Sequence, residues 1–209
     1  RTLIPILNVT LEKQSNVRVI CGDVMRTDLA LLVKECFGED CSSLRIAANL
    51  PYYITTDVLT KLMNELPQAQ SIAVMIQKEV GDKLLSSPGE DGYGPLAVMC
   101  QYHYNVVRAL DVPAACFNPP PKVDSSFMVL ERLETPYVDG GDEAVFTRLV
   151  RSAFTMRRKT LLNNLISGFA LNREQAASYL EAVGLSVQAR AEELSLEDFA
   201  KLSRQLQSL

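Results

Sequence analysis

The chain has 209 residues, 47% of them hydrophobic and 22% charged, which is ordinary for a soluble globular protein of one or two domains. No apolar run reaches the length of a membrane span and the start shows no signal-peptide pattern, so we predict a cytoplasmic protein with no membrane partner. A net charge of −4 excludes nucleic-acid binding unless positive charge is gathered in a local patch.

Cysteine and histidine usage excludes several kinds of site. The five cysteines are odd in number and lack C-x-x-C spacing, which predicts reduced thiols, no disulfide framework and no metal site. His103 is the only histidine, and we interpret it as a partly buried packing residue.

The first elements in chain order are a helix predicted over residues 1–13 and a strand over residues 17–21. Asp23 follows that strand, with Val24 and Met25 beside it. A carboxylate just past a strand can accept a hydrogen bond from the amino group of an adenine while the apolar pair flanks the ring. A helix or turn cap is the alternative role for Asp23.

Asn49, Leu50, Pro51 and Tyr52 come directly after an apolar run at residues 44–48 that predicts a buried strand. Open α/β sheets place their ligands at the carboxyl ends of strands. The Asn oxygen can accept a hydrogen bond from an amine, and Pro51 stiffens the turn. The Tyr ring can stack on a base and favour developing positive charge. The alternative is a turn in which Tyr52 only packs.

Further strands and helices alternate along the next part of the chain. Strands are predicted at residues 71–76, 106–110 and 126–133, and helices at residues 29–37, 57–66, 77–86 and 95–104. This alternation predicts an α/β fold with a largely parallel sheet, in which the last two strands form an antiparallel pair.

Residues 117–126 contain three consecutive prolines, which exclude a helix and predict a rigid extended loop. We expect this loop to present Phe117 on one side, and Lys122 to reach a phosphate.

Residues 134–142 form a polar break that we interpret as a domain boundary, giving domains at residues 1–136 and 137–209. Beyond it, the sequence predicts only helices, at residues 143–154, 159–169, 173–183 and 196–206. Asn172 with Gln175 and Ser195 with Asp198 are typical capping pairs, and Gly184 is typical of a helix stop.

A basic cluster lies in the predicted helical domain. Its five members within twelve residues, with no acidic residue between them, are Arg148, Arg151, Arg157, Arg158 and Lys159. A solvated helix face is the ordinary explanation of such a cluster. Because this is the only concentrated positive patch in an acidic chain, we predict phosphate contact.

The chain resembles the small-subunit ribosomal RNA adenine N6,N6-dimethyltransferase family, the type named for kasugamycin sensitivity, nearly from end to end. The resemblance rests on the order and spacing of six segments: Gly22-Asp23-Val24-Met25, Asn49-Leu50-Pro51-Tyr52, Gln77-Lys78-Glu79-Val80, Tyr93-Gly94, residues 117–125 and Arg157-Arg158-Lys159-Thr160.

The resemblance implies a class I S-adenosylmethionine methyltransferase fold, an α/β Rossmann-like sheet, followed by a small all-helical C-terminal domain. It implies an enzyme of small-subunit biogenesis that dimethylates two adjacent adenines near the 3′ end of 16S rRNA, with a pre-30S particle as partner. The implied site residues are Asn49, Tyr52 and Phe117 for catalysis, and Asp23 and Asn49 for the cofactor. From the residues themselves we add Leu50 and Pro51 for catalysis, Val24 and Met25 for the cofactor, and Lys122 with the basic cluster for RNA.

The resemblance also implies the sheet order 3-2-1-4-5-7-6, with the Gly-rich loop and the ribose-binding acid of the family lying before Arg1. We therefore expect an N-terminally truncated sheet whose absent strands would lie between residues 17–21 and 44–48. Residues 17–21 would then be displaced, paired directly with residues 44–48, or joined to another chain. Cofactor binding is expected to be impaired.

Three other functions fit parts of the pattern. A large-subunit rRNA adenine methylase of the macrolide-resistance type shares the Asn49 loop, but residues 117–125 and 157–160 argue against it. A non-enzymatic ribosome-assembly factor would not require the intact Asn49 loop. A DNA amino-methyltransferase usually carries a Pro-Pro-Tyr version of that loop.

Overall fold

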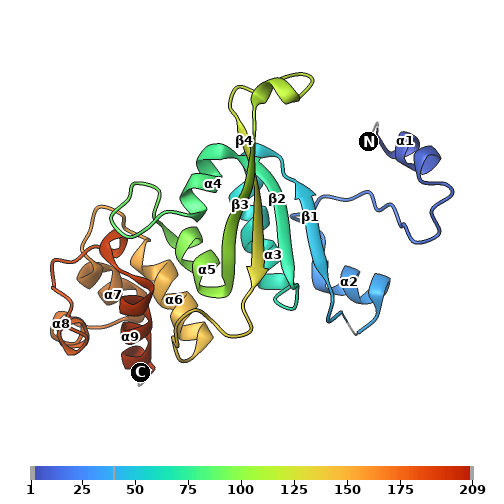
Figure 1. The fold of residues 1–209 in the computed structure, drawn as a ribbon. Coiled ribbons are helices and arrows are strands. Elements are labelled where there is room, and N and C mark those ends of the chain that lie inside the picture. Colours follow the sequence, from blue (N-terminus) through green and yellow to red (C-terminus); the bar gives the residue numbers. More distant parts are fainter. Residues whose placement is uncertain (1–2, 40, 208–209) are drawn as a thin grey trace. The chain divides into compact units, whose positions relative to one another are not determined.

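The computed structural model describes residues 3–39 and 41–207, and the chain divides into two compact units. The first unit comprises residues 1–41 and 57–68, and the second comprises residues 42–56 and 69–209. Each unit has its own elements, which Figure 1 labels along the chain. No described helix combines the length and the apolar character needed to cross a membrane.

The second unit is built on a four-stranded sheet with the order β1-β2-β4-β3 (Figure 1). The strands are β1 (Arg45–Asn49), β2 (Ser71–Gln77), β3 (Tyr104–Val112) and β4 (Ser125–Arg132). Their order agrees with the last four strands of the order implied by the resemblance, and the antiparallel pairing of β3 with β4 is confirmed.

The expectation of a largely parallel sheet is wrong for the described strands. β1 runs parallel to β2, but β4 is antiparallel to both β2 and β3. The reason is the connection, because a hairpin reverses the chain, whereas parallel neighbours need a long crossover. β4 follows β3 through such a hairpin and inserts between β3 and β2, so one strand creates two antiparallel pairs.

Two helices of the second unit pack on the sheet. α4 (Lys78–Leu84) contacts β2, β3 and β4, whereas α5 (Pro95–His103) contacts β3. The contact of α4 with β4 is close at Gly81, where an added methyl group would lie 3.1 Å from Sδ of Met128 and 3.2 Å from Cβ of Ser126. The lack of a side chain at Gly81 therefore lets the helix approach the sheet.

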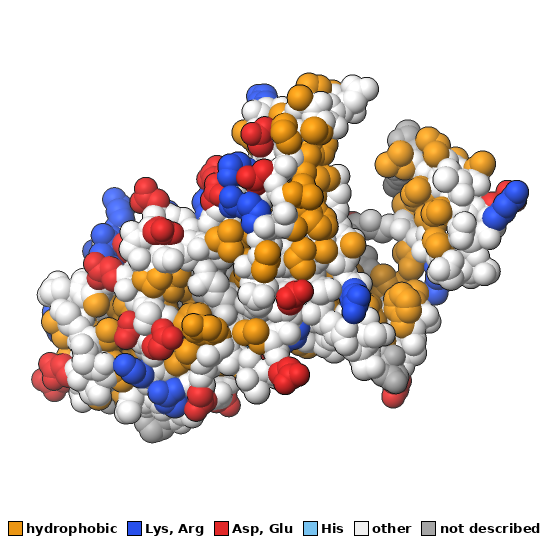
Figure 2. All heavy atoms as spheres, viewed as in Figure 1, with side chains coloured by type: hydrophobic (Ala, Val, Ile, Leu, Met, Phe, Trp, Pro, Cys, Tyr) orange, Lys and Arg blue, Asp and Glu red, His pale blue; other side chains and the backbone are white. Residues whose placement is uncertain are grey.

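β3 forms one edge of the described sheet and carries exposed apolar side chains. Val107 and Leu110 are 43% and 51% exposed, and Figure 2 shows hydrophobic side chains gathered along the β3–β4 hairpin. Beside them lies a group of mixed charge that includes Lys78, Asp82 and Arg108, in which Arg108 is paired with Asp82.

The region after β4 is helical, as predicted, with α6 (Glu143–Ala153), α7 (Leu161–Phe169), α8 (Arg173–Ala182) and α9 (Leu196–Leu206). Both predicted capping pairs are confirmed as capping boxes, from Asn172 to Gln175 and from Ser195 to Asp198. Gly184 takes a positive φ of 77° just past α8, as the helix stop required.

The helices share one core with part of the preceding chain. Phe146, Leu165 and Phe199 are buried in the same cluster as Tyr93 and Tyr102, and the Tyr102 ring stacks on Phe146 with centroids 3.8 Å apart. The division after residue 136 therefore stays a prediction, because the apolar core continues across it.

Helices α6 and α7 cross at a point where only a glycine fits. A methyl group on Gly168 would lie 2.5 Å from Cβ of Ser152 and closer still to its hydroxyl oxygen. We predict that Gly168→Ala lowers the free energy of unfolding by about 1–3 kcal/mol, because overpacking forces the two helices apart. Denaturant unfolding measures this loss. Ser167→Ala is the control, since it creates the same residue at an exposed position of α7 and should leave stability nearly unchanged.

His103 is buried, as predicted, with 6% of its surface exposed. Its Nε2 lies 3.5 Å from the Glu143 carboxylate, and its ring meets Tyr102 edge-on at 4.7 Å. Burial lowers the pKa of His103, the Arg132 guanidinium lowers it further, and Glu143 acts in the opposite direction. His103 therefore stays neutral to a lower pH in the folded protein than in the unfolded chain.

This lowered pKa predicts a loss of stability in mild acid. The unfolded state binds a proton at His103 as the pH falls below the unfolded pKa of about 6.5. The folded state binds this proton only near its own, lower pKa, so the free energy of unfolding decreases between the two pKa values. We expect the free energy of unfolding of His103→Asn to depend less on pH between neutrality and that lower value than the wild type does. Thermal unfolding across this range checks it, and identical slopes for the two proteins would contradict it.

The first unit contains α1 (Leu3–Thr10), α2 (Leu29–Phe37) and most of α3 (Thr55–Glu65). The helix predicted over residues 1–13 is confirmed for Leu3–Thr10, and residues 1–2 of that prediction lie outside the described residues.

The strand predicted at residues 17–21 is wrong, since these residues have no regular structure. Val17 and Ile20 are 43% and 44% exposed. A strand persists only when a neighbour pairs its backbone N–H and C=O groups, and in the described chain β1 pairs with β2 alone. Whether residues 17–21 are displaced, paired with residues 44–48 or joined to another chain stays a prediction, because the two segments belong to different units.

Candidate active site

The Asn49 loop leaves the carboxyl end of β1, as predicted. Asn49 is the last residue of the strand and its side chain is exposed. The buried Leu50 donates its N–H to the Met75 carbonyl at 3.1 Å, and the Thr55 hydroxyl donates to the Pro51 carbonyl at 3.2 Å. The loop is thus held directly after Asn49, while the Asn49 side chain is exposed.

Tyr52 is fixed through its hydroxyl group. It opens a short 3-10 helix (Tyr52–Ile54), is half-buried, and places its hydroxyl 2.6 Å from Oγ of Ser125. Tyr53, the next residue, is 86% exposed. Only the first of the two tyrosines is therefore held in place within the loop.

Phe117 follows a short 3-10 helix (Ala114–Cys116) in the loop between β3 and β4. Its N–H donates to the Ala114 carbonyl at 3.1 Å, its ring is half-buried, and Lys122 further along the loop is exposed. The Asp124 carboxylate accepts from the N–H of Ala114 at 2.9 Å, which closes the loop at its base.

The two loops start at the same end of the sheet. Asn49 pairs in register with Met75 of β2, and Ser125 pairs with Gln77 of β2 and Val112 of β3. The carboxyl ends of β1, β2 and β3 and the beginning of β4 therefore meet at one edge. Sequence spacing alone did not reveal Ser125 as a site residue, although it lies inside the segment that carries the resemblance.

Asp23 caps a turn in the first unit. Its Oδ1 accepts from the N–H of Met25 at 3.0 Å, its carbonyl accepts from Arg26 and Thr27, and Arg26 lies 3.7 Å from its other carboxylate oxygen. The turn-cap role is confirmed. The cofactor role of Asp23 with Val24 and Met25 stays a prediction.

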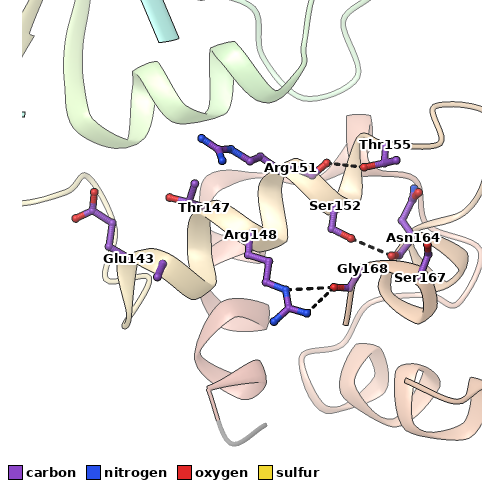
Figure 3. Close-up of a pocket in the computed structure, with 10 residues that line it drawn as sticks. Glu143, Thr147, Arg148, Arg151, Ser152, Thr155, Asn164, Ser167 and Gly168 are labelled. Carbon is purple, nitrogen blue, oxygen red and sulfur yellow. Dashed lines mark hydrogen bonds between the residues drawn. The ribbon is translucent and has the colours of Figure 1, made fainter. Parts of the chain in front are cut away.

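Arg148 has a structural partner that the sequence did not predict. Its Nε and Nη2 donate to the Gly168 carbonyl at 3.2 and 2.8 Å (Figure 3). Its guanidinium lies 4.5 Å above the Phe169 ring. Arg148 therefore caps the carboxyl end of α7. Its role in binding RNA, predicted from charge alone, stays a prediction.

The other members of the basic cluster are exposed. Arg151 extends away from Arg148 in Figure 3, and Arg157, Arg158 and Lys159 lie on the turn between α6 and α7. Arg157 is anchored through its backbone, because its carbonyl accepts from the Arg190 guanidinium at 2.9 Å. The turn thus carries three adjacent exposed cationic side chains, of which Arg157 also donates to the Asp91 carbonyl at 3.5 Å.

A pocket of about 720 Å³ lies between α6 and α7. Its walls include Arg148 and Arg151, the hydroxyl groups of Thr147, Thr155 and Ser167, and the acidic Glu143 (Figure 3). It contains no residue of the Asn49 loop. Within the part of the chain that the structure describes, no group of three or more His, Cys, Asp or Glu side chains could hold a metal ion.

The fold and sequence match known ribosomal RNA methyltransferases. A dimethyladenosine transferase from Plasmodium falciparum superposes with a TM-score of 0.77 at 22% identity, over 99% of this chain and 79% of the other. The 23S rRNA methyltransferase ErmE superposes with a TM-score of 0.65 at 21% identity, over 99% of this chain and 78% of the other. These likenesses and the sheet order define the class as a class I methyltransferase fold.

A family model described as ribosomal RNA adenine dimethylase matches residues 1–208. Proteins called ribosomal RNA small subunit methyltransferase A from Macrococcus caseolyticus (strain JCSC5402) and Bacillus mycoides (strain KBAB4) are each 42% identical over 207 residues, which is 98% of this chain and 70% of each relative. The chain belongs to the ribosomal RNA adenine dimethylase family. The resemblance drawn from the sequence is confirmed, and so is its interpretation as an enzyme of this family.

Proposed function

We propose that this protein transfers methyl groups from S-adenosylmethionine to the N6 atoms of two adjacent adenines near the 3′ end of small-subunit rRNA. The observation that carries the proposal is the exposed Asn49 at the carboxyl end of β1, held beside a fixed Tyr52. The 42% identity to small subunit methyltransferases supports the choice of rRNA. A cytoplasmic small-subunit precursor is the substrate particle that this function requires.

The residues proposed to contact the cofactor fit its adenine. The Asp23 carboxylate is 57% exposed and has acceptor capacity beyond its bond to Met25, and Val24 and Met25 offer apolar side chains next to it. These three residues would hold the adenine of S-adenosylmethionine. When bound, this cofactor supplies an electrophilic methyl group.

The protein's own contribution to the reaction is positioning. The Asn49 oxygen accepts one N–H of the target amine, which turns the nitrogen lone pair out of conjugation with the ring. The Thr55 hydroxyl already donates to the Pro51 carbonyl, and we assign the second amine contact to the Leu50 carbonyl. Tyr52 and Phe117 stack on the adenine, and such orientation can supply roughly 7–11 kcal/mol of the barrier.

RNA affinity is assigned to cationic side chains outside this loop. Lys122, Arg151, Arg157, Arg158 and Lys159 are all exposed and can reach phosphates. A loop base must be splayed out to reach the aromatic side chains, as in other single-stranded RNA recognition.

Methyl transfer to purified ribosomal particles tests the function. The full-length protein is incubated with labelled S-adenosylmethionine and unmethylated small-subunit particles, and digested rRNA is analysed by mass spectrometry. We expect N6,N6-dimethyladenosine at two adjacent positions of small-subunit rRNA. A parallel reaction contains large-subunit particles instead. Methylation of large-subunit rRNA alone would contradict the proposal and favour a methylase of the macrolide-resistance type.

A further inference from the structure

Three segments of the second unit are tied together at two consecutive residues. The Asp124 carbonyl accepts from the N–H of Lys78 at 3.0 Å, and its carboxylate accepts from the N–H of Ala114 at 2.9 Å. Ser125 then meets the Tyr52 hydroxyl at 2.6 Å. The start of α4, the base of the Phe117 loop and the Asn49 loop therefore share one anchor.

One of the two anchor residues, Ser125, lies inside the sheet, whereas Asp124 is exposed just before β4. Ser125 is fully buried and pairs with β2 on one side and β3 on the other. A buried hydroxyl group needs a hydrogen-bond partner, and Tyr52 supplies one to Ser125. This hydrogen bond therefore fixes the orientation of the Tyr52 ring.

Ser126 provides an internal comparison. It is also fully buried and stands next to Ser125 on β4, but its hydroxyl donates to the Asp111 carboxylate at 2.5 Å. That bond joins β4 to the end of β3 and involves neither aromatic side chain of the site. The two serines are thus equally buried but have different hydrogen-bond partners, the Tyr52 hydroxyl for Ser125 and the Asp111 carboxylate for Ser126.

We infer that Asp124 and Ser125 are positioning residues for the methyl-transfer reaction, which fix the Phe117 loop and the Tyr52 ring as two walls of a slot for a flat base. The inference rests on the proposed function. Asp124 acts through Ala114, at the base of the Phe117 loop, and Ser125 acts through the Tyr52 hydroxyl. Neither residue needs to touch the RNA.

Steady-state kinetics on rRNA particles test the inference. We expect Ser125→Ala to lower kcat about tenfold, the effect of one hydrogen bond, while the KM for the particle stays within about twofold because phosphate contacts provide most of the affinity. Ser125→Thr should restore kcat. In the Tyr52→Phe background, Ser125→Ala should cause no further loss, since the bond is already gone.

Matched variants separate positioning from general damage to the sheet. Asp124→Ala should lower kcat and Asp124→Asn, which keeps an acceptor, should restore it. Ser126→Ala should lower the unfolding midpoint at least as much as Ser125→Ala does, because its partner is a carboxylate, with kcat near the wild-type value. Equal losses of kcat in Ser125→Ala and Ser126→Ala, or additive losses of Ser125→Ala and Tyr52→Phe, would overturn the inference.

A second measurement does not depend on activity. NMR of protein carrying ¹³C-labelled tyrosine, with the Tyr52 ring signal assigned by its loss in Tyr52→Phe, reports ring order directly. We expect this signal to shift and broaden in Ser125→Ala and to stay unchanged in Ser126→Ala. A signal unaffected by Ser125→Ala would overturn the inference, whereas wild-type protein inactive on rRNA but with the expected NMR change would contradict only the proposed function.

Discussion

Asn49→Ala is expected to lower kcat for methyl transfer by about 10²–10³-fold, the loss typical of removing one preorganised polar group that stabilises a transition state. The Asn49 oxygen is the group proposed to orient the amine, and charge develops on that amine only as the methyl group is transferred. The interaction is therefore stronger in the transition state than in the bound substrate.

The affinity for RNA should change by less than about twofold in the same variant, because phosphate contacts to other residues supply it. The fold should also be unaffected, since the Asn49 side chain is exposed and the loop is anchored through Leu50 and Thr55. Single-turnover methylation and filter binding, measured on the same particles, separate the two effects.

Tyr53→Phe is the matched control for the Asn49 loop. Tyr53 lies in the same loop, is 86% exposed, and the variant removes one hydroxyl group without changing the ring. It should methylate at the wild-type rate. Parallel losses of binding and turnover in Asn49→Ala would contradict the assigned role.

The second large effect is expected from the turn between α6 and α7. Replacing Arg157, Arg158 and Lys159 together by Gln should weaken RNA binding about ten- to a hundredfold at moderate salt and reduce the log–log salt slope by about 0.7–0.9 per lost phosphate contact. The three side chains are adjacent and exposed, and the Arg190 bond to the Arg157 carbonyl holds their backbone in place.

Titrations of RNA at several salt concentrations measure this slope. Arg173→Gln combined with Lys201→Gln is the control, because both residues are exposed cations of the helical region outside the basic cluster. This control should leave the slope unchanged. A triple variant with the wild-type slope would show that the cluster is only a solvated surface.

Arg148 illustrates a limit of reading charge from sequence. In the chain it is one of five cations within twelve residues, and nothing in that pattern distinguishes it from Arg151. The fold brings the Gly168 carbonyl and the Phe169 ring to it from another helix. Its contribution to α7 could not be predicted, because the partner is twenty residues away and meets it only after α6 and α7 pack.

Ser125 shows the same limit within a motif. The sequence placed it in the segment that carries the resemblance, but its partner Tyr52 lies 73 residues earlier. That pairing depends on β4 entering the sheet next to β2, which brings Ser125 into register with Gln77. The insertion of β4, and with it the mixed direction of the sheet, follows from a hairpin and not from the alternation of elements.

The sequence by itself determined those features whose hydrogen bonds are local. The helices of the second unit, the capping boxes at Asn172 and Ser195 and the stop at Gly184 depend on residues a few positions apart, so their side-chain pattern is sufficient. The order and spacing of the short segments likewise sufficed to identify the family.

Only the tertiary structure decided which strand-like segments become strands and which polar groups act together. Residues 17–21 are mostly apolar, as in a strand, but have no regular structure, whereas residues 45–49 form β1 because β2 pairs with them. The backbone N–H and C=O groups of a strand form hydrogen bonds with a neighbouring strand that is distant in sequence. The buried hydroxyl of Ser125 likewise finds its partner in the distant Tyr52. Such pairings exist only once the chain has folded, which is why local pattern cannot report them.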